Sequence, residues 1–219
     1  MPQEPGYGIL GGTFDPPHLG HLALAQEVYT RLALDRVWFV PAGQPPHKAG
    51  HVVSPAADRR AMVELAIAGD PRFGLSTVEL ERGGPSYTSE TLALLRAAWG
   101  SAARMVLILG WDMLAYLPHW HEPKRVVALT DQIVAIHRPG VAAPEGELAR
   151  LEGSLPALAQ KLVVLPAPRL EISSSELRAR VAEGLPVRYL TPLAVADYIA
   201  LRRLYRGYEP EADTRPDPC

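Results

Sequence analysis

The stretch GGTFDPPHLGHLALAQEV, residues 11–28, decides the fold because it joins a predicted strand to a predicted helix. The apolar run YGIL at 7–10 comes directly before it and is typical of a strand. Its second half has apolar residues at the 3.6-residue spacing of an amphipathic helix, namely Leu19, Leu22, Ala23 and Val28. Asp15 is expected to cap this helix, and Pro16 suits its first turn, where a missing N–H leaves no bond unmade.

Two histidines, His18 and His21, lie three residues apart at the start of this helix. Residues at that spacing are neighbours on one helix face, so both imidazoles should lie beside free backbone N–H groups and the positive end of the helix dipole. Gly11 and Gly12 would let further N–H groups approach a phosphate. The pattern predicts an anion site. The alternatives are a plain turn with inert surface histidines, or a metal pair, for which spacing indicates no third ligand.

Composition limits the class of protein. The chain has 219 residues, 47% of them hydrophobic, which suits one sizeable core. We predict a single domain over 1–206 and a disordered tail over 207–219, where proline and acidic residues leave little to bury. A net charge of -2 without a run of Lys or Arg predicts neither nucleic acid nor a membrane as the main partner.

The apolar segments and the cysteine count of the sequence bear on the cellular location and on disulfides. No basic leader and no long apolar stretch are visible, so a cytoplasmic location is expected. Cys219 is the only cysteine, which excludes an internal disulfide and a cysteine-based zinc site. The sequence leaves the oligomeric state open, including a homo-oligomer.

Strand-like and helix-like segments alternate along the chain. Apolar runs predict further strands at 36–41, 73–80, 104–110, 132–137 and 161–166. Helices are predicted near 19–33, 55–68, 88–99, 144–160, 174–183 and 192–205. The alternation predicts an α/β fold, a Rossmann-like doubly wound and mostly parallel sheet with helices on both faces and a small C-terminal helical part. In such sheets ligands bind beyond the carboxyl ends of the strands, where the strand order reverses.

Two motifs carry a resemblance to a known superfamily. GTFDPPHLGH, residues 12–21, has the form G-x-F-x-P-x-H-x-G-H, which resembles the signature of the nucleotidylyltransferases, relatives of class I aminoacyl-tRNA synthetases. EISSSELR, residues 171–178, resembles the second motif, I-S-[ST]-[ST]-x-x-R. Ser173 and Glu176 have capping-box spacing. The same helix start would hold polyphosphate on hydroxyls and N–H groups, with Arg178 as a bidentate cation.

Other blocks narrow the resemblance to bacterial nicotinate mononucleotide adenylyltransferases over about residues 8–205. They are VPAGQPPHK (40–48), GPSYTSETL (84–92), LGWDMLAYLPHWHEP (109–123), HRPG (137–140) and GLPVRYLTPLAVADYI (184–199). The resemblance implies that ATP and nicotinate mononucleotide give nicotinate adenine dinucleotide and pyrophosphate, a step of NAD synthesis, with Mg²⁺ accompanying ATP. Trp111 departs from the family, which usually has a small residue there. His119 and His121 have no assigned role.

The resemblance also implies residue roles. Catalysis is expected from His18, His21, Lys48 and Arg178, with the histidines on the triphosphate, Lys48 on the mononucleotide phosphate and Arg178 on the β and γ phosphates. ATP binding is expected from Gly11, Gly12, Thr13, His18, His21, Gly110, Asp112, Ile172, Ser173, Ser174, Ser175 and Arg178. Mononucleotide binding is expected from Phe14, Asp15, Lys48, Tyr87, Thr88, Trp120 and Arg138. No protein residue is expected to bind a metal.

Several of these residues also have ordinary structural interpretations. Trp120 would fit a hydrophobic core, Lys48 a solvated loop, and Thr88 the cap of a helix. Two other functions stay open. Phosphopantetheine adenylyltransferase shares the end motifs, but its first motif usually has Thr in place of His18 and its chain is shorter. A noncatalytic nucleotide sensor would not need the residues that face the α-phosphate. An RNA-binding role lacks a basic patch.

Overall fold

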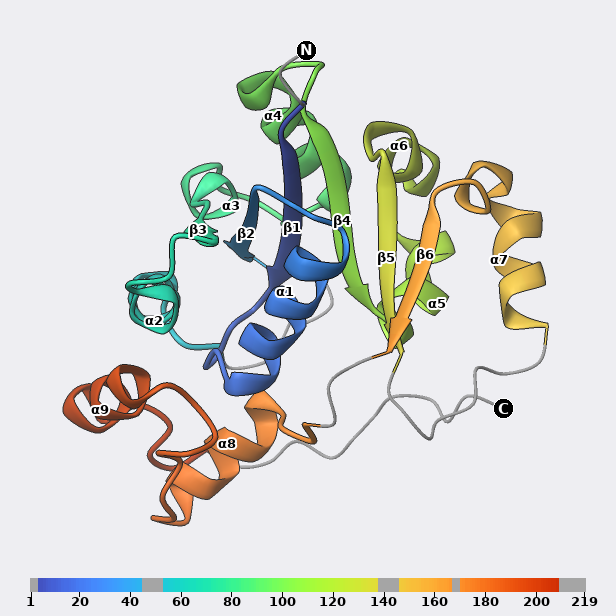
Figure 1. Cartoon of the computed structure of the whole chain (residues 1–219). Helices are drawn as coiled ribbons and strands as arrows, with labels where there is room; N and C mark the ends of the chain where they lie inside the picture. The colour runs from blue at the N-terminus through green and yellow to red at the C-terminus, as the bar shows by residue number, and fades with distance from the viewer. Residues whose placement is uncertain (1–3, 45–52, 138–145, 167–169, 209–219) are drawn as a thin grey trace.

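In the part of the chain that the structure describes, a six-stranded sheet forms the centre of the protein (Figure 1). The computed structural model describes residues 4–44, 53–137, 146–166 and 170–208. Its strands are β1 (Gly6–Gly12), β2 (Arg36–Pro41), β3 (Phe73–Leu75), β4 (Arg104–Gly110), β5 (Gln132–His137) and β6 (Leu162–Pro166), in the order β3-β2-β1-β4-β5-β6 with every pair parallel. The strand order reverses between β1 and β4, which confirms the predicted Rossmann-like sheet.

Helices cover both faces of this sheet. The core on one face involves α1 (Leu19–Arg31) and α2 (Ala56–Ile67). The core on the other face involves α4 (Thr88–Trp99), α5 (Trp111–Tyr116), α6 (Pro123–Leu129) and α7 (Glu147–Ser154). The shorter elements are α3 (Val78–Glu81) and two 3₁₀ helices, Leu117–His119 and Pro156–Leu158. The C-terminal helices α8 (Ser174–Ala182) and α9 (Leu193–Arg202) lie at the end of the sheet to which the strand arrowheads point (Figure 1).

Alternating apolar side chains of the central strands build two cores. On β4, Met105 and Leu107 face the α4 side, whereas Val106 and Ile108 face the α1 side, and all four are at most 2% exposed. Burying such a side chain stabilises the fold by roughly 1.5–3 kcal/mol, which is why these runs are apolar almost throughout. A third, smaller cluster of Met62, Val195 and Ile199 joins α9 to α2.

Three predictions about local structure are wrong. The strand expected over 73–80 ends at Leu75, because the chain leaves the sheet edge after Ser76 donates to the Phe39 carbonyl and then forms α3. The helix expected over 144–160 ends at Ser154, where Pro156 cannot continue it. α5 and α6 were not expected as helices at all.

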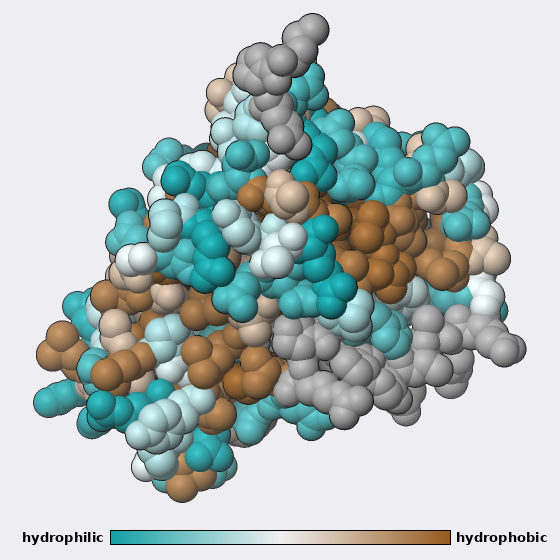
Figure 2. Space-filling model, in the orientation of Figure 1, coloured by the Kyte–Doolittle hydropathy of each residue, from teal (hydrophilic) through white to brown (hydrophobic). Residues whose placement is uncertain are grey.

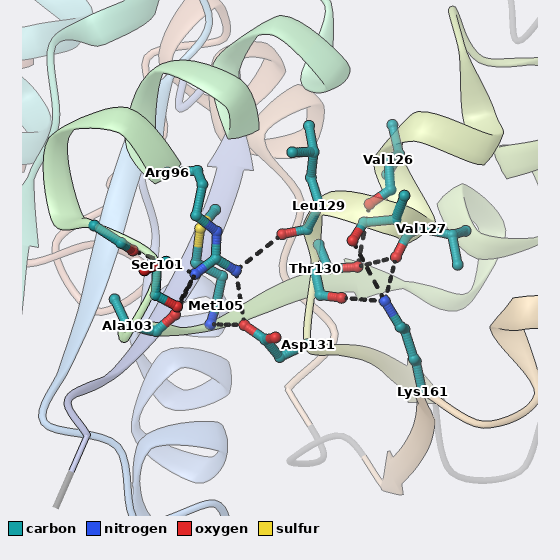
Figure 3. A network of polar contacts seen from close by, with 12 residues as sticks. Arg96, Ser101, Ala103, Met105, Val126, Val127, Leu129, Thr130, Asp131 and Lys161 are labelled. Carbon is teal, nitrogen blue, oxygen red and sulfur yellow. Dashed lines mark hydrogen bonds and ion pairs between the residues drawn. The ribbon is translucent and has the colours of Figure 1, made fainter.

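The starts of the strands are held by charged side chains (Figure 3). Arg96, at the end of α4, donates to Asp131 at 2.8 Å, and Asp131 accepts the N–H of Met105 at 2.7 Å. Lys161 donates to the Thr130 carbonyl at 2.6 Å. These bonds link the beginnings of β4, β5 and β6 at the end of the sheet opposite to α8.

The surface seen in Figure 2 carries hydrophobic atoms over the place of β5 and β6, near the sheet edge. On this α1 side of the sheet, Val163 and Leu165 of β6 are only partly buried against the core. Among the described residues, no helix combines the length and apolar character that a membrane span requires.

Candidate functional site

The two sequence motifs meet at the carboxyl end of the sheet. Ser174 Oγ donates to the Pro16 carbonyl at 2.8 Å, and Arg178 Nη1 donates to the Asp15 carbonyl at 2.8 Å. Thr191, in the loop before α9, donates to the Pro17 carbonyl at 2.6 Å. The loop between β1 and α1 is therefore held by the C-terminal helices, and the start of α8 lies against the start of α1.

His18 and His21 lie together, as predicted. Their rings stack with centroids 3.7 Å apart and an interplanar angle of 26°. The backbone N–H of His18 donates to His21 Nδ1 at 3.2 Å. That nitrogen is therefore unprotonated, and the neutral His21 ring carries its hydrogen on Nε2. The expectation that Asp15 caps the helix is wrong, because α1 begins at Leu19 and His18 occupies the cap position.

Burial makes both imidazoles neutral in the protein without ligands. It lowers the pKa of His18 to about 4. Burial, and next the charge of His18, lower the pKa of His21 well below its ordinary value of 6.5. At neutral pH the pair therefore offers N–H donors and no net charge. A polyphosphate beside the rings would favour their protonated forms, because an opposite charge at short range raises the pKa of a base.

Asp15 and Phe14, both expected at the mononucleotide, direct their side chains into the protein. Asp15 is 2% exposed, and its carboxylate accepts from Tyr205 Oη at 2.7 Å and from the Ser54 N–H at 3.1 Å. Phe14 is 2% exposed and packs at 5.0 Å from the His21 ring, with its backbone at φ 52°. Both side chains shape the loop, and contact with a mononucleotide stays a prediction for these two residues.

Arg178 is buried at the junction of the two motifs, with 8% of its surface exposed. Its Nη2 donates to Ser175 Oγ and to Tyr208 Oη, each at 3.1 Å, while Nε has no partner among the described residues. Ser173 accepts from the Glu176 N–H at 3.1 Å, which confirms the predicted cap of α8. The guanidinium is thus fixed in place and keeps an unused donor, as a group that binds phosphate requires.

Asp112 and Gly110 lie where β4 passes into α5. Gly110 occupies the cap position of α5, and Asp112 is exposed in its first turn. Trp111, the residue that departs from the family pattern, is directed elsewhere: its indole N–H donates to Glu147 on α7 at 2.7 Å. Its ring also meets that of His137 edge-on at 5.2 Å. The large side chain therefore packs against α7 and β5 and leaves Asp112 accessible.

Tyr87, Thr88 and Trp120 lie around the start of α4. α4 begins at Thr88 with Tyr87 in the cap position and no side-chain cap, so the expected threonine cap is wrong. The Tyr87 ring stacks on His121 with centroids 4.2 Å apart. Trp120 is partly buried against the α4-side core. Ser86 accepts the Gly43 N–H at 2.9 Å, which ties this segment to the loop after β2.

The remaining residues expected at the nucleotides lie at the end of β1, in the β1–α1 loop, before α8, or outside the described part of the chain. Gly11 and Gly12 end β1, and an added Cβ at Gly12 would lie 3.1 Å from the Phe14 ring. The Thr13 carbonyl accepts from Arg59 at 3.0 Å, and the Ile172 carbonyl lies 3.8 Å from an ideal Cβ on Gly20. Lys48 and Arg138 lie outside the described residues.

Arg59 is a central residue that we did not predict. It is 2% exposed, and its guanidinium donates to the carbonyls of Ser54 at 3.0 Å, Ala42 at 2.6 Å and Gly43 at 3.2 Å, in addition to Thr13. It thereby joins the loops that follow β1 and β2. The pattern did contain a signal, since Arg59 shares one helix face with Met62 and Val63.

Glu79, Tyr205 and Tyr208 were also missed. Glu79 is 8% exposed and accepts from Thr91 Oγ1 at 2.7 Å, and burial raises the pKa of its carboxyl. Tyr208, expected in a disordered tail, contacts Arg178, whereas 209–219 lie outside the described residues. These contacts join residues that are not neighbours in the sequence, so no local pattern could predict them.

Comparison with known proteins agrees with this geometry. A model of the cytidylyltransferase-like family matches residues 9–180. A protein of Thermomicrobium roseum named "Probable nicotinate-nucleotide adenylyltransferase" is 46% identical over 202 residues, 92% of either chain. A protein of the same name from a Roseiflexus species is 49% identical over 199 residues, which is 91% of this chain and 97% of the relative.

Solved structures share the fold. Plasmodium falciparum nicotinic acid mononucleotide adenylyltransferase complexed with NaAD superposes with a TM-score of 0.73 over 92% of this chain and 97% of that one, at 21% identity. The same protein complexed with APC gives a TM-score of 0.69 over the same shares, at 20% identity. The family match and the close relatives show that this chain belongs to the cytidylyltransferase-like family and, within it, to the nicotinate-nucleotide adenylyltransferases.

Proposed function

We propose that this protein transfers the AMP moiety of ATP to nicotinate mononucleotide, releasing pyrophosphate and forming nicotinate adenine dinucleotide. The observation that carries the proposal is the joining of the two motifs, with the stacked pair His18 and His21 and the cation Arg178 around one loop. The names of the relatives support nicotinate mononucleotide as the acceptor of the AMP group.

The reaction needs positioning more than proton transfer. A phosphate monoester has a second pKa of about 6, so the attacking oxygen is largely ionised at neutral pH and needs no general base. The obstacle is repulsion between two anions, which fixed donors and cations relieve. We assign His18 and His21 to the charge that develops at the α-phosphate. Arg178, with Ser173, Ser174 and Ser175, is assigned to the β and γ phosphates.

The acceptor is assigned to the start of α4. The N–H groups of Thr88 and Ser89 lie in the first turn, where no intrahelical acceptor is available, and they suit the ring carboxylate of nicotinate. Trp120 is assigned to stacking on the pyridine ring, and Lys48 to the mononucleotide phosphate. A site whose N–H groups bind both carboxylate oxygens would discriminate against the amide, because one of its donors would then face the NH2 group of the amide instead of an oxygen.

Mg²⁺ is proposed to bind with ATP. Within the described residues no three His, Cys, Asp or Glu side chains are grouped to hold an ion. Mg²⁺ that accompanies ATP would be held mainly by phosphate oxygens and water, which is the usual arrangement for this ion. The ion would neutralise charge on the triphosphate, while His18, His21 and Arg178 would orient the triphosphate.

The decisive experiment measures pyrophosphate release with ATP, Mg²⁺ and one of three acceptors: nicotinate mononucleotide, nicotinamide mononucleotide or phosphopantetheine. Strong preference for the nicotinate form is expected. Pyrophosphate release with phosphopantetheine alone would show a phosphopantetheine adenylyltransferase. Binding of ATP without pyrophosphate release would favour a noncatalytic nucleotide sensor.

Two variants test the residue roles. His21→Ala should lower kcat by at least about 100-fold, the scale of one lost transition-state donor, while His119→Ala, which alters an exposed imidazole, is the control. Arg178→Ala should raise the KM for ATP. Near-normal turnover of folded His21→Ala, or unchanged ATP kinetics of Arg178→Ala, would remove that residue from the site.

A further inference from the structure

Tyr208 lies directly against the cation that we assign to the triphosphate. The guanidinium carbon of Arg178 is 4.6 Å from the centroid of the Tyr208 ring. The Tyr208 hydroxyl accepts a hydrogen bond from Arg178 Nη2 at 3.1 Å. One side chain thus contacts Arg178 both through a ring face and through a polar atom.

A turn after α9 brings Tyr208 to this position. The N–H of Tyr208 donates to the Tyr205 carbonyl at 3.1 Å, and Gly207 between them has φ 77°, which suits glycine. Tyr205 itself has φ 63°, an uncommon conformation for a bulky residue. Its hydroxyl donates to Asp15 at 2.7 Å, so the turn is fastened to the loop between β1 and α1. The two tyrosines therefore reach the two motifs from a single turn.

These contacts leave Arg178 with few orientations. Asp15 O and Ser175 Oγ accept from the two ends of its guanidinium, and the Tyr208 ring covers a face of it. A long side chain that is already fixed loses less conformational freedom when it binds a ligand, which improves affinity. The Nε atom is buried and has no partner among the described residues, so its N–H is still available to donate to a phosphate oxygen.

We propose that Tyr208 is a positioning residue that orients Arg178 for the triphosphate of ATP. The inference rests on the proposed function, since it assumes that Arg178 binds ATP. Tyr208 itself need not touch the substrate. Its contribution should be visible in the affinity for ATP and absent from the affinity for nicotinate mononucleotide.

The experiment compares Tyr208→Ala, Tyr208→Phe, Arg178→Ala and the double variant by steady-state kinetics with each substrate varied in turn. Loss of the ring and hydroxyl contacts to a charged group should raise the KM for ATP about tenfold in Tyr208→Ala. Tyr208→Phe keeps the ring and should raise the KM for ATP about threefold. The KM for nicotinate mononucleotide should stay within about twofold. Tyr189→Ala, which removes a tyrosine that is 85% exposed, is the matched control.

The double variant separates positioning from general stabilisation. Adding Tyr208→Ala to Arg178→Ala should change the KM for ATP no further, because the residue through which Tyr208 acts is gone. A KM for ATP within twofold of the wild type in both Tyr208 variants, or an undiminished effect in the double variant, would overturn the proposal. If Arg178→Ala alone left the KM for ATP unchanged, the assignment of Arg178 would fail as well, and the proposal with it. Failure of the proposed function would appear separately, as no pyrophosphate release by the wild type.

Discussion

Replacing Arg59 by methionine tests whether the loops at the carboxyl end of the sheet depend on one buried guanidinium. Methionine keeps an apolar stem and deletes four hydrogen bonds to backbone carbonyls. Bonds from a charged donor contribute about 1.5–3 kcal/mol each, so the gross loss is roughly 6–12 kcal/mol. Against it stands the cost of burying the ion, several kcal/mol. Burial lowers the pKa of Arg59, whereas the nearby Asp15 raises it.

The net expectation is a fall of about 3–5 kcal/mol in the free energy of unfolding for Arg59→Met. Urea denaturation followed by circular dichroism, extrapolated to water, measures it. Arg60→Met is the matched control, because Arg60 is exposed and pairs with Glu64 at 2.9 Å on the surface. That pair should contribute no more than about 0.5 kcal/mol. A difference between the two variants below about 1 kcal/mol would refute the reasoning.

Three further outcomes are expected. As the pH falls from 6.5 to 4, the free energy of unfolding should fall by at least about 3 kcal/mol, because His18 takes up its proton at a higher pH in the unfolded chain than in the fold and the buried His21 adds to the effect; His18→Gln should remove the part due to His18, and an unchanged slope would contradict it. Trp111→Phe should cost about 1 kcal/mol of stability yet keep the KM for ATP within twofold, whereas a large rise would place that side chain at ATP. Because burial raises the pKa of Glu79, its contribution to stability falls as the pH rises through that pKa; Glu79→Gln should therefore be at least as stable at pH 8, and a loss above 1 kcal/mol would show that the charge is needed.

Local patterns predicted most of the sheet and the helix that carries the histidines. β2, β4 and β5 have the predicted bounds because their apolar runs are buried on both faces. Apolar spacing placed the start of α1 near Leu19, as observed, whereas the predicted cap at Asp15 with Pro16 in the first turn is wrong and begins the helix three residues too early. α6 was missed although Glu122 precedes Pro123, which occupies the first helical position that proline prefers.

The side-chain partners in the site could not be predicted in this way. Asp15 has the composition of a cap, but its carboxylate meets Tyr205 and Ser54, residues 190 and 39 positions away. Arg59 lies on the same helix face as apolar residues, but its partners are carbonyls in the loops after β1 and β2, which only the packed fold brings to its guanidinium. Such contacts depend on the assembled fold, whereas capping and periodicity depend on neighbours in the chain.

The joining of Pro16 to Ser174 and of Pro17 to Thr191 has a consequence for biosynthesis. These partners are 158 and 174 residues apart, so a ribosome has produced nearly the whole chain before the second member of either pair exists. The strands from β1 to β6 are synthesised earlier, so all the parts of the sheet exist before these contacts can form. A nascent chain arrested before α8 would therefore contain the sheet and both histidines yet lack the contacts that complete the nucleotide site.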